Sequence, residues 1–83
     1  MESTRWTKPV TFEENSRGRY RTIGSTEEAA RVLMERWPVQ TGKAYRKACE
    51  VMLAVLEGRR EQGVARLAFL AAADEANVYI RNS

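Results

Sequence analysis

Few side chains in this sequence are of the types that perform chemistry, and their spacing does not bring them together. The 83 residues include no histidine and a single cysteine, Cys49, which excludes imidazole–nucleophile dyads and metal sites built from cysteine and histidine. Three pairs of adjacent carboxylates remain, at Glu13-Glu14, Glu27-Glu28 and Asp74-Glu75. Neighbours in sequence point apart on a helix or a strand, so none of these pairs forms an acid–base dyad. The sequence therefore disfavours an enzyme and predicts no cofactor and no metal.

One segment, Thr41-Gly42-Lys43, is similar to the end of a phosphate-binding loop. The full pattern needs a glycine five residues before Gly42, where Trp37 stands, and Ser or Thr after Lys43, where Ala44 stands. Because there is no glycine-rich loop to hold a phosphate, we interpret this segment as the start of a helix.

The lone cysteine is predicted to be a packing residue. Cys49 lies in the middle of a predicted helix, between Tyr45 and Leu53 on its apolar stripe, and this is a usual place for an inert buried thiol. A reactive thiol would need exposure and nearby cations or a helix N-terminus to lower its pKa. One cysteine allows no intramolecular disulfide, which indicates a reducing compartment, and we expect a cytoplasmic protein.

A basic strand is the main feature that suggests a polyanion ligand. Arg17, Arg19 and Arg21 alternate along a predicted strand, and basic strands with interleaved aromatic residues bind single-stranded nucleic acid in some proteins. The alternation places Tyr20 on the opposite face from the arginines, and two glutamates of the preceding strand would face the same groove. The sequence favours a solvated sheet face here, with nucleic-acid or polyanion binding as the alternative.

The elements that position these residues must fit in one small domain. The chain has 43% hydrophobic and 30% charged residues and a net charge of +3, which is typical of a globular protein. We expect a single domain over residues 1–83, with residues 1–8 as a loosely ordered N-terminal segment. The longest uncharged apolar run, Leu67 to Ala73, has seven residues, far too few to span a membrane.

Residues 9 to 23 predict a β-hairpin with a turn at residues 15 to 18. A five-residue connection would place Phe12 and Tyr20 on one face and leave Arg19 and Arg21 outside. A four-residue connection would instead pair Phe12 with Arg21. The first register buries the aromatic rings and solvates the charges, so it is preferred, although Ile23 then needs a bulge to turn inward.

Three helices are expected after the hairpin, at residues 26 to 37, 42 to 57 and 61 to 76. Residues 25 to 28 form a capping box for the first, Pro38 ends it, and Gly58 supplies a left-handed cap for the second. Residues 78 to 80 can add a short strand beside the hairpin. The predicted fold class is α+β, with an N-terminal antiparallel hairpin, three helices and this third strand.

The first two helices carry apolar stripes that we predict to face the core. The stripe of the first helix includes Leu33, Met34 and Trp37, and that of the second includes Met52, Leu53 and Leu56, with Tyr45, Ala48 and Cys49 before them. The indole of Trp37 either closes one end of the core or, if exposed beside Pro38, marks an interface; the core is favoured.

The third helix is apolar around most of its circumference, which suggests burial on several sides or contact with a second subunit. On this pattern Leu67 and Leu70 are candidates for a homodimer interface. Arg66 is one of its few polar residues and is a further candidate interaction residue.

The order of these features resembles the domain of unknown function 982 family, small proteins seen mainly in rhizobia and related bacteria. The resemblance spans residues 9 to 80 and rests on an ordered set of positions: Pro9-Val10, Glu28-Ala29-Ala30, Trp37-Pro38, Gly42, Tyr45, Ala48, Cys49, Gly58, Ala65-Arg66, Phe69, Ala72-Ala73 and Glu75-Ala76. Asn77 departs from the glycine common there, but both residues adopt the left-handed cap. The resemblance implies a fold and no mechanism.

The leading functional hypothesis is a non-enzymatic protein-interaction module that self-associates, with Trp37, Leu67, Leu70 and Arg66 as candidate interaction residues. The alternative is a nucleic-acid or polyanion-binding protein that uses Arg17, Arg19 and Arg21. An enzyme is the least favoured class, because no convergent catalytic set is visible.

Overall fold

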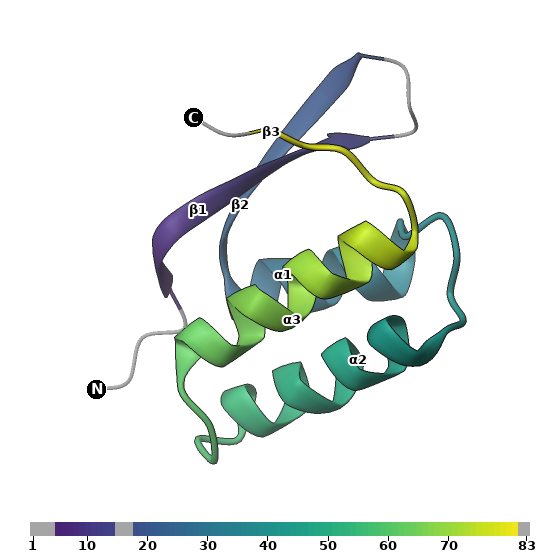
Figure 1. Ribbon diagram of the computed structural model, residues 1–83. Coiled ribbons are helices and arrows are strands. Elements are labelled where there is room, and N and C mark those ends of the chain that lie inside the picture. The colour runs from purple at the N-terminus through teal and green to yellow at the C-terminus, as the bar shows by residue number, and fades with distance from the viewer. Residues whose placement is uncertain (1–4, 15–17, 82–83) are drawn as a thin grey trace.

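The fold consists of one three-stranded sheet with three helices on one side of it (Figure 1). The computed structural model describes residues 5–14 and 18–81. The elements follow in the order β1 (Arg5–Glu14), β2 (Arg19–Ser25), α1 (Thr26–Glu35), α2 (Lys43–Leu56), α3 (Gln62–Glu75) and β3 (Ile80–Arg81). The predicted α+β architecture, including the short third strand, is confirmed. No helix among these residues is long and apolar enough to cross a membrane.

Strand β1 begins at Arg5, four residues before the predicted start, because Trp6 belongs to the core. The Trp6 indole N–H donates a 2.9 Å hydrogen bond to Thr26 Oγ1, and that hydroxyl donates to Gln62 Oε1 at 2.7 Å. Thr26 is fully buried at the start of α1, and Gln62 begins α3. This relay satisfies the buried polar groups and joins the beginnings of three elements.

The hairpin register differs from the preferred prediction. Phe12 pairs with Arg21, and Val10 pairs with Ile23, which is the four-residue connection. Directly paired residues share a face of the sheet, so this register buries Ile23 against the helices without the expected bulge. It leaves Tyr20 44% exposed on the opposite face. The five-residue prediction was wrong because burial of Ile23 outweighs burial of Tyr20, whose ring can remain in water with its hydroxyl.

Strand β1 is the middle strand, in the order β2-β1-β3. Strand β3 is antiparallel to it and pairs Ile80 with Phe12 and Arg81 with Thr11. The backbone N–H of Glu13 also donates to the Tyr79 carbonyl at 2.9 Å. The chain therefore returns after α3 to extend the sheet on the side away from β2.

Helix α1 begins at the predicted capping box. Ser25 Oγ accepts from the Glu28 N–H at 3.1 Å, and the Glu28 carboxylate accepts from the Gly24 N–H at 2.8 Å. At the other end, the Gln40 side chain donates to the Met34 carbonyl at 2.8 Å. The loop after α1 thus folds back and satisfies one of the carbonyls that a helix end leaves free.

Helix α2 is capped by a residue from another helix. Its N-cap, Gly42, has no side chain, and the carboxylate of Glu75 at the end of α3 takes that role. Glu75 Oε1 accepts from the Ala44 N–H at 2.9 Å, and Glu75 Oε2 accepts from the Tyr45 N–H at 3.1 Å. The carboxylate stands in the space that a Gly42 side chain would occupy. This contact explains why an acid stands at the C-terminal end of α3, where the dipole of its own helix disfavours it.

The interhelical cap makes the stability of the fold depend on pH. Hydrogen bonds from the Ala44 and Tyr45 N–H groups lower the pKa of Glu75 below its ordinary value. Because the pKa of Glu75 is lower in the folded state, its carboxylate stabilises the fold at pH values above the ordinary pKa of about 4.3. This contribution is lost as the pH falls through the lower, folded-state pKa. We expect Glu75→Gln to lower the free energy of unfolding at pH 7, measured by urea denaturation, and the difference from wild type to shrink towards pH 3. Asp74→Asn, the same charge change one residue earlier, is the control, and an equal loss there would contradict the cap.

Gly42 is expected to tolerate no side chain. Its φ of 115° and ψ of 159° lie in a region that is nearly exclusive to glycine, and a Cβ would displace the Glu75 carboxylate. Gly42→Ala should therefore cost about 1–3 kcal/mol or more of unfolding free energy in urea denaturation. Gly63→Ala is the control, because Gly63 lies in the first turn of α3 with no atom within 4 Å of an added Cβ, and it should leave stability unchanged or raised. Equal losses in the two variants would be inconsistent with a special role for Gly42.

Candidate functional site

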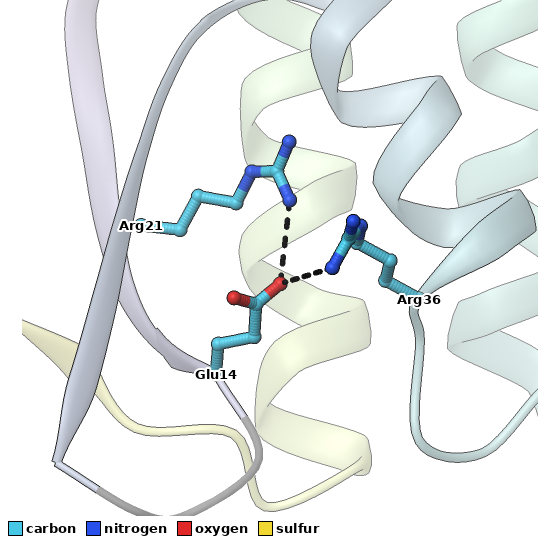
Figure 2. Close-up of polar contacts among 3 residues, drawn as sticks. All are labelled: Glu14, Arg21 and Arg36. Atoms are coloured by element: carbon cyan, nitrogen blue, oxygen red, sulfur yellow. Dashed lines mark hydrogen bonds and ion pairs between the residues drawn. The ribbon is translucent and has the colours of Figure 1, made fainter.

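The polar cluster at the end of the hairpin contains one of the three arginines that the sequence singled out. Arg21 Nη1 lies 3.3 Å and Arg36 Nη1 3.5 Å from the same oxygen of the Glu14 carboxylate, as Figure 2 shows. Arg36 is the C-cap of α1, where the helix dipole favours a cation. Two guanidinium groups and one carboxylate leave a single positive charge. The Glu14 side chain is only 18% exposed, so the cluster closes the helix side of the hairpin.

The three predicted arginines do not form one open basic face among the described residues. Arg21 lies on the helix side of the sheet because it pairs with Phe12, and its guanidinium is bound to Glu14. Arg19 is exposed and pairs with Glu14 across the hairpin. Arg17 lies outside the described residues.

A small cleft lies beside this cluster, between the hairpin end, the end of α1 and the segment after α3. Its volume is about 90 Å³, and its walls include Glu14, Arg36, Trp37 and Asn77. Pockets that hold cofactors or drug-sized ligands typically measure about 300–1,000 Å³. The cleft is therefore of a size for a few water molecules and does not suit a cofactor or nucleotide.

Trp37 forms one wall of the cleft and is part of the core. It is 5% exposed, and its ring centroid lies 5.2 Å from that of Phe69 and 6.1 Å from that of Phe12. Its indole N–H is buried and has no hydrogen-bond partner among the described residues. The structure thus places Trp37 at the closed end of the core, not on an exposed surface.

The other predicted interaction residues occupy three different environments on α3. Leu67 is 65% exposed, whereas Leu70 is half-buried and packs against the core. The Arg66 guanidinium donates a 2.9 Å hydrogen bond to the Lys8 carbonyl of β1. Helix α3 contacts α2, β1 and α1, so most of its apolar circumference is covered within the domain.

A more extended exposed apolar surface lies between α1 and α2. A groove of about 120 Å³ is lined there by apolar side chains and the cysteine: Ala30, Leu33, Met34, Cys49, Met52, Leu53 and Leu56. Three of them are exposed, Met34 by 70%, Leu53 by 55% and Leu56 by 41%. We call this surface the α1/α2 groove. Contiguous exposed apolar side chains of this kind are typical of interaction surfaces.

The sequence placed Met34, Leu53 and Leu56 on stripes that were predicted to face the core. The signal that could have distinguished them is the width of the apolar arc of α2. Val51 and Val55 are also apolar, and the structure buries them instead. One helix cannot bury both sides of so wide an arc unless it has a partner on each side.

The groove also contains the free thiol. Cys49 is half-buried and packs against the core, in agreement with its predicted packing role. Burial, followed by interaction with the Cys49 thiol, raises the pKa of Tyr45. The Tyr45 hydroxyl donates a 3.0 Å hydrogen bond to the Leu33 carbonyl, which ties α2 to α1. These contacts hold the walls of the groove together.

No group of three or more His, Cys, Asp or Glu side chains in residues 5–14 and 18–81 could hold a metal ion. Three carboxylates have structural roles: Glu14 binds Arg21 and Arg36, Glu28 caps α1, and Glu75 caps α2.

The chain matches one protein family, described as a protein of unknown function (DUF982), over residues 8–80. No curated protein shows significant similarity to it. No solved structure does so either.

Trp37 offers a direct test of its place in the core. We expect Trp37→Ala to cost about 3–5 kcal/mol of unfolding free energy, measured by chemical denaturation, because the rings of Phe12 and Phe69 lose a common neighbour. Val39→Ala is the control, since Val39 lies two residues further along the same loop and is 46% exposed, and it should change stability by about 0.5 kcal/mol or less. A folded Trp37→Ala protein of unchanged stability would place the indole at an interface instead.

Proposed function

The chain belongs to the DUF982 family of proteins of unknown function, and we propose that it is a non-enzymatic protein-interaction module that self-associates through the α1/α2 groove. The observation that carries this proposal is the exposure of Met34, Leu53 and Leu56 around one apolar depression. Full burial of a side chain of this kind contributes about 1.5–3 kcal/mol, and these three, which are 41–70% exposed, can contribute the corresponding part of it. A domain of this size buries little surface alone, so shared area adds to its stability.

A second copy of the chain is the partner that the surrounding charges favour. Arg31 and Glu35 on α1 and Arg46 and Glu50 on α2 are exposed. Because each is within one turn of a groove residue on the same helix, exposed charges of both signs stand near the groove. A two-fold contact places the same surface of two copies face to face. Because the rim of the groove carries both charges, an acid of each copy can pair with a base of the other. A strongly acidic or basic partner would find no matching field here.

The α1/α2 groove replaces the α3 surface as the proposed interface. Leu67 and Leu70 were predicted to form an interface on α3. Leu70 packs within the monomer, so it does not join Leu67 on an exposed surface. The groove instead joins three exposed side chains from two helices. We place this association in the cytoplasm, because a lone cysteine suits a reducing compartment.

Sedimentation analysis of two matched variants tests the interface. Met34 is 70% exposed on α1 and Leu67 is 65% exposed on α3, so glutamate at either position should leave the monomer folded. We expect the wild type to dimerise at micromolar concentrations. Met34→Glu should weaken the dimer about tenfold or more, because each of the two copies buries a charge in an apolar contact. Leu67→Glu should sediment like the wild type.

Two results would overturn this proposal. The first is a wild type that stays monomeric at several hundred micromolar. The second is the reverse pattern, with dissociation by Leu67→Glu and none by Met34→Glu, which would return the interface to α3. Thermal unfolding of each variant, expected to match the wild-type monomer, separates dissociation from unfolding.

A further inference from the structure

The helices lie on one side of the sheet and leave its other face uncovered (Figure 1). This open face carries a pair of exposed aromatic rings. Tyr20 on β2 is 44% exposed, and Tyr79 just before β3 is 58% exposed. Their ring centroids lie 6.5 Å apart with an interplanar angle of 71°. Tyr20 faces outward because its neighbours Arg21 and Arg19 pair with Phe12 and Glu14 on the helix side. Two strands that flank β1 thus bring these rings together over it.

A guanidinium group completes this surface. The Arg81 guanidinium carbon lies 5.0 Å from the centre of the Tyr20 ring, within the range of a cation–π contact. No carboxylate of the described residues is ion-paired with Arg81. The positive charge is therefore held at the sheet surface by an aromatic ring and is not neutralised there. We call Tyr20, Tyr79 and Arg81 the sheet platform.

The remaining side chains near the platform are short or already engaged. The hydroxyl groups of Thr11 and Thr22 hydrogen-bond to each other at 2.8 Å. Glu13, which pairs with Tyr20 across the hairpin, is half-buried, and its carboxylate accepts from the Gly18 N–H at 2.9 Å. Glu13 therefore shares the open face with the two rings, and its carboxylate is engaged by the backbone of the hairpin end.

We propose that the sheet platform binds single-stranded nucleic acid, with bases stacked on Tyr20 and Tyr79 and Arg81 in contact with the sugar–phosphate backbone. Stacking on exposed aromatic rings of an open sheet, combined with nearby cations, is how several folds hold single strands. The net charge of +3 favours a polyanion over a basic or neutral partner. A duplex does not fit, because its bases are stacked on one another and cannot stack on the tyrosine rings.

This binding site is independent of the proposed self-association. The register places the platform residues on the face of the sheet opposite to buried Phe12, and so away from the helices that form the α1/α2 groove. A dimer formed through that groove leaves the platform open, and loss of either activity leaves the other measurable. The site also differs from the predicted set of Arg17, Arg19 and Arg21, since Arg21 faces the helices.

Fluorescence anisotropy with labelled ten-nucleotide oligonucleotides tests this inference. At low salt we expect micromolar binding of single-stranded RNA and DNA and at least tenfold weaker binding of the matching duplex. Tyr20→Leu and Tyr79→Leu should each weaken single-strand binding about fivefold or more, whereas Tyr20→Phe keeps the ring and should bind like the wild type. Arg81→Gln should weaken binding and reduce its dependence on salt. Leu67→Ala, an exposed substitution on α3, is the control and should have no effect.

Three results would overturn the inference. They are an absence of single-strand binding at 100 µM protein in low salt, equal affinity for single strand and duplex, and equal losses in Tyr20→Leu and Tyr20→Phe. Thermal unfolding curves that coincide with the wild type show that each variant is folded, so that a loss of binding is assigned to the platform.

Discussion

The packing of one ring, Phe69, is the interaction on which the rest of the structure depends. Phe69 is fully buried in α3, and its ring centroid lies 6.2 Å from that of Trp6, 5.6 Å from Phe12 and 5.2 Å from Trp37. Each of these three partners belongs to a different part of the chain: the start of β1, the middle of β1 and the segment after α1. Alanines along α3 permit close approach of the neighbouring elements. The ring therefore fixes where the sheet and the end of α1 must lie.

The same constraint decides both faces of the sheet. Because Phe12 must point towards Phe69, its partner Arg21 must point to the same side, and there it pairs with the Glu14 carboxylate, which also binds Arg36. Strand alternation then sends Tyr20 to the open face. One register choice thus removes an arginine from the solvent face and places an aromatic ring there. The cost of leaving Tyr20 in water is small, since its polar hydroxyl remains hydrated.

The sequence predicted those features that depend on residues close together in the chain. The capping box at Ser25 and Glu28, the helix break before Pro38 and the turn at Gly58 all involve residues a few positions apart, and the structure has α1 and α2 beginning and ending near them. The register could not be predicted in the same way, because the choice between Tyr20 and Ile23 depends on helices that follow later in the chain. The cap that Glu75 places on α2 joins residues about 30 positions apart, and nothing in the spacing of Glu75 indicates this contact.

Leu53 and Leu56 of α2 were predicted to face the core, because the sequence does not show which neighbours cover a helix. Their exposure explains where the proposed interface lies. A wide apolar arc on one helix indicates how much surface must be buried, but it does not indicate which neighbour buries it. Helix α2 contacts both α3 and α1, and its Val51 and Val55 are buried, whereas Leu53 and Leu56 stay exposed beside α1. The Tyr45 hydroxyl donates to the Leu33 carbonyl, so the end of α1 meets the beginning of α2. Leu53 and Leu56 lie about two to three turns further along α2, where α1 leaves them exposed and an apolar surface stays open.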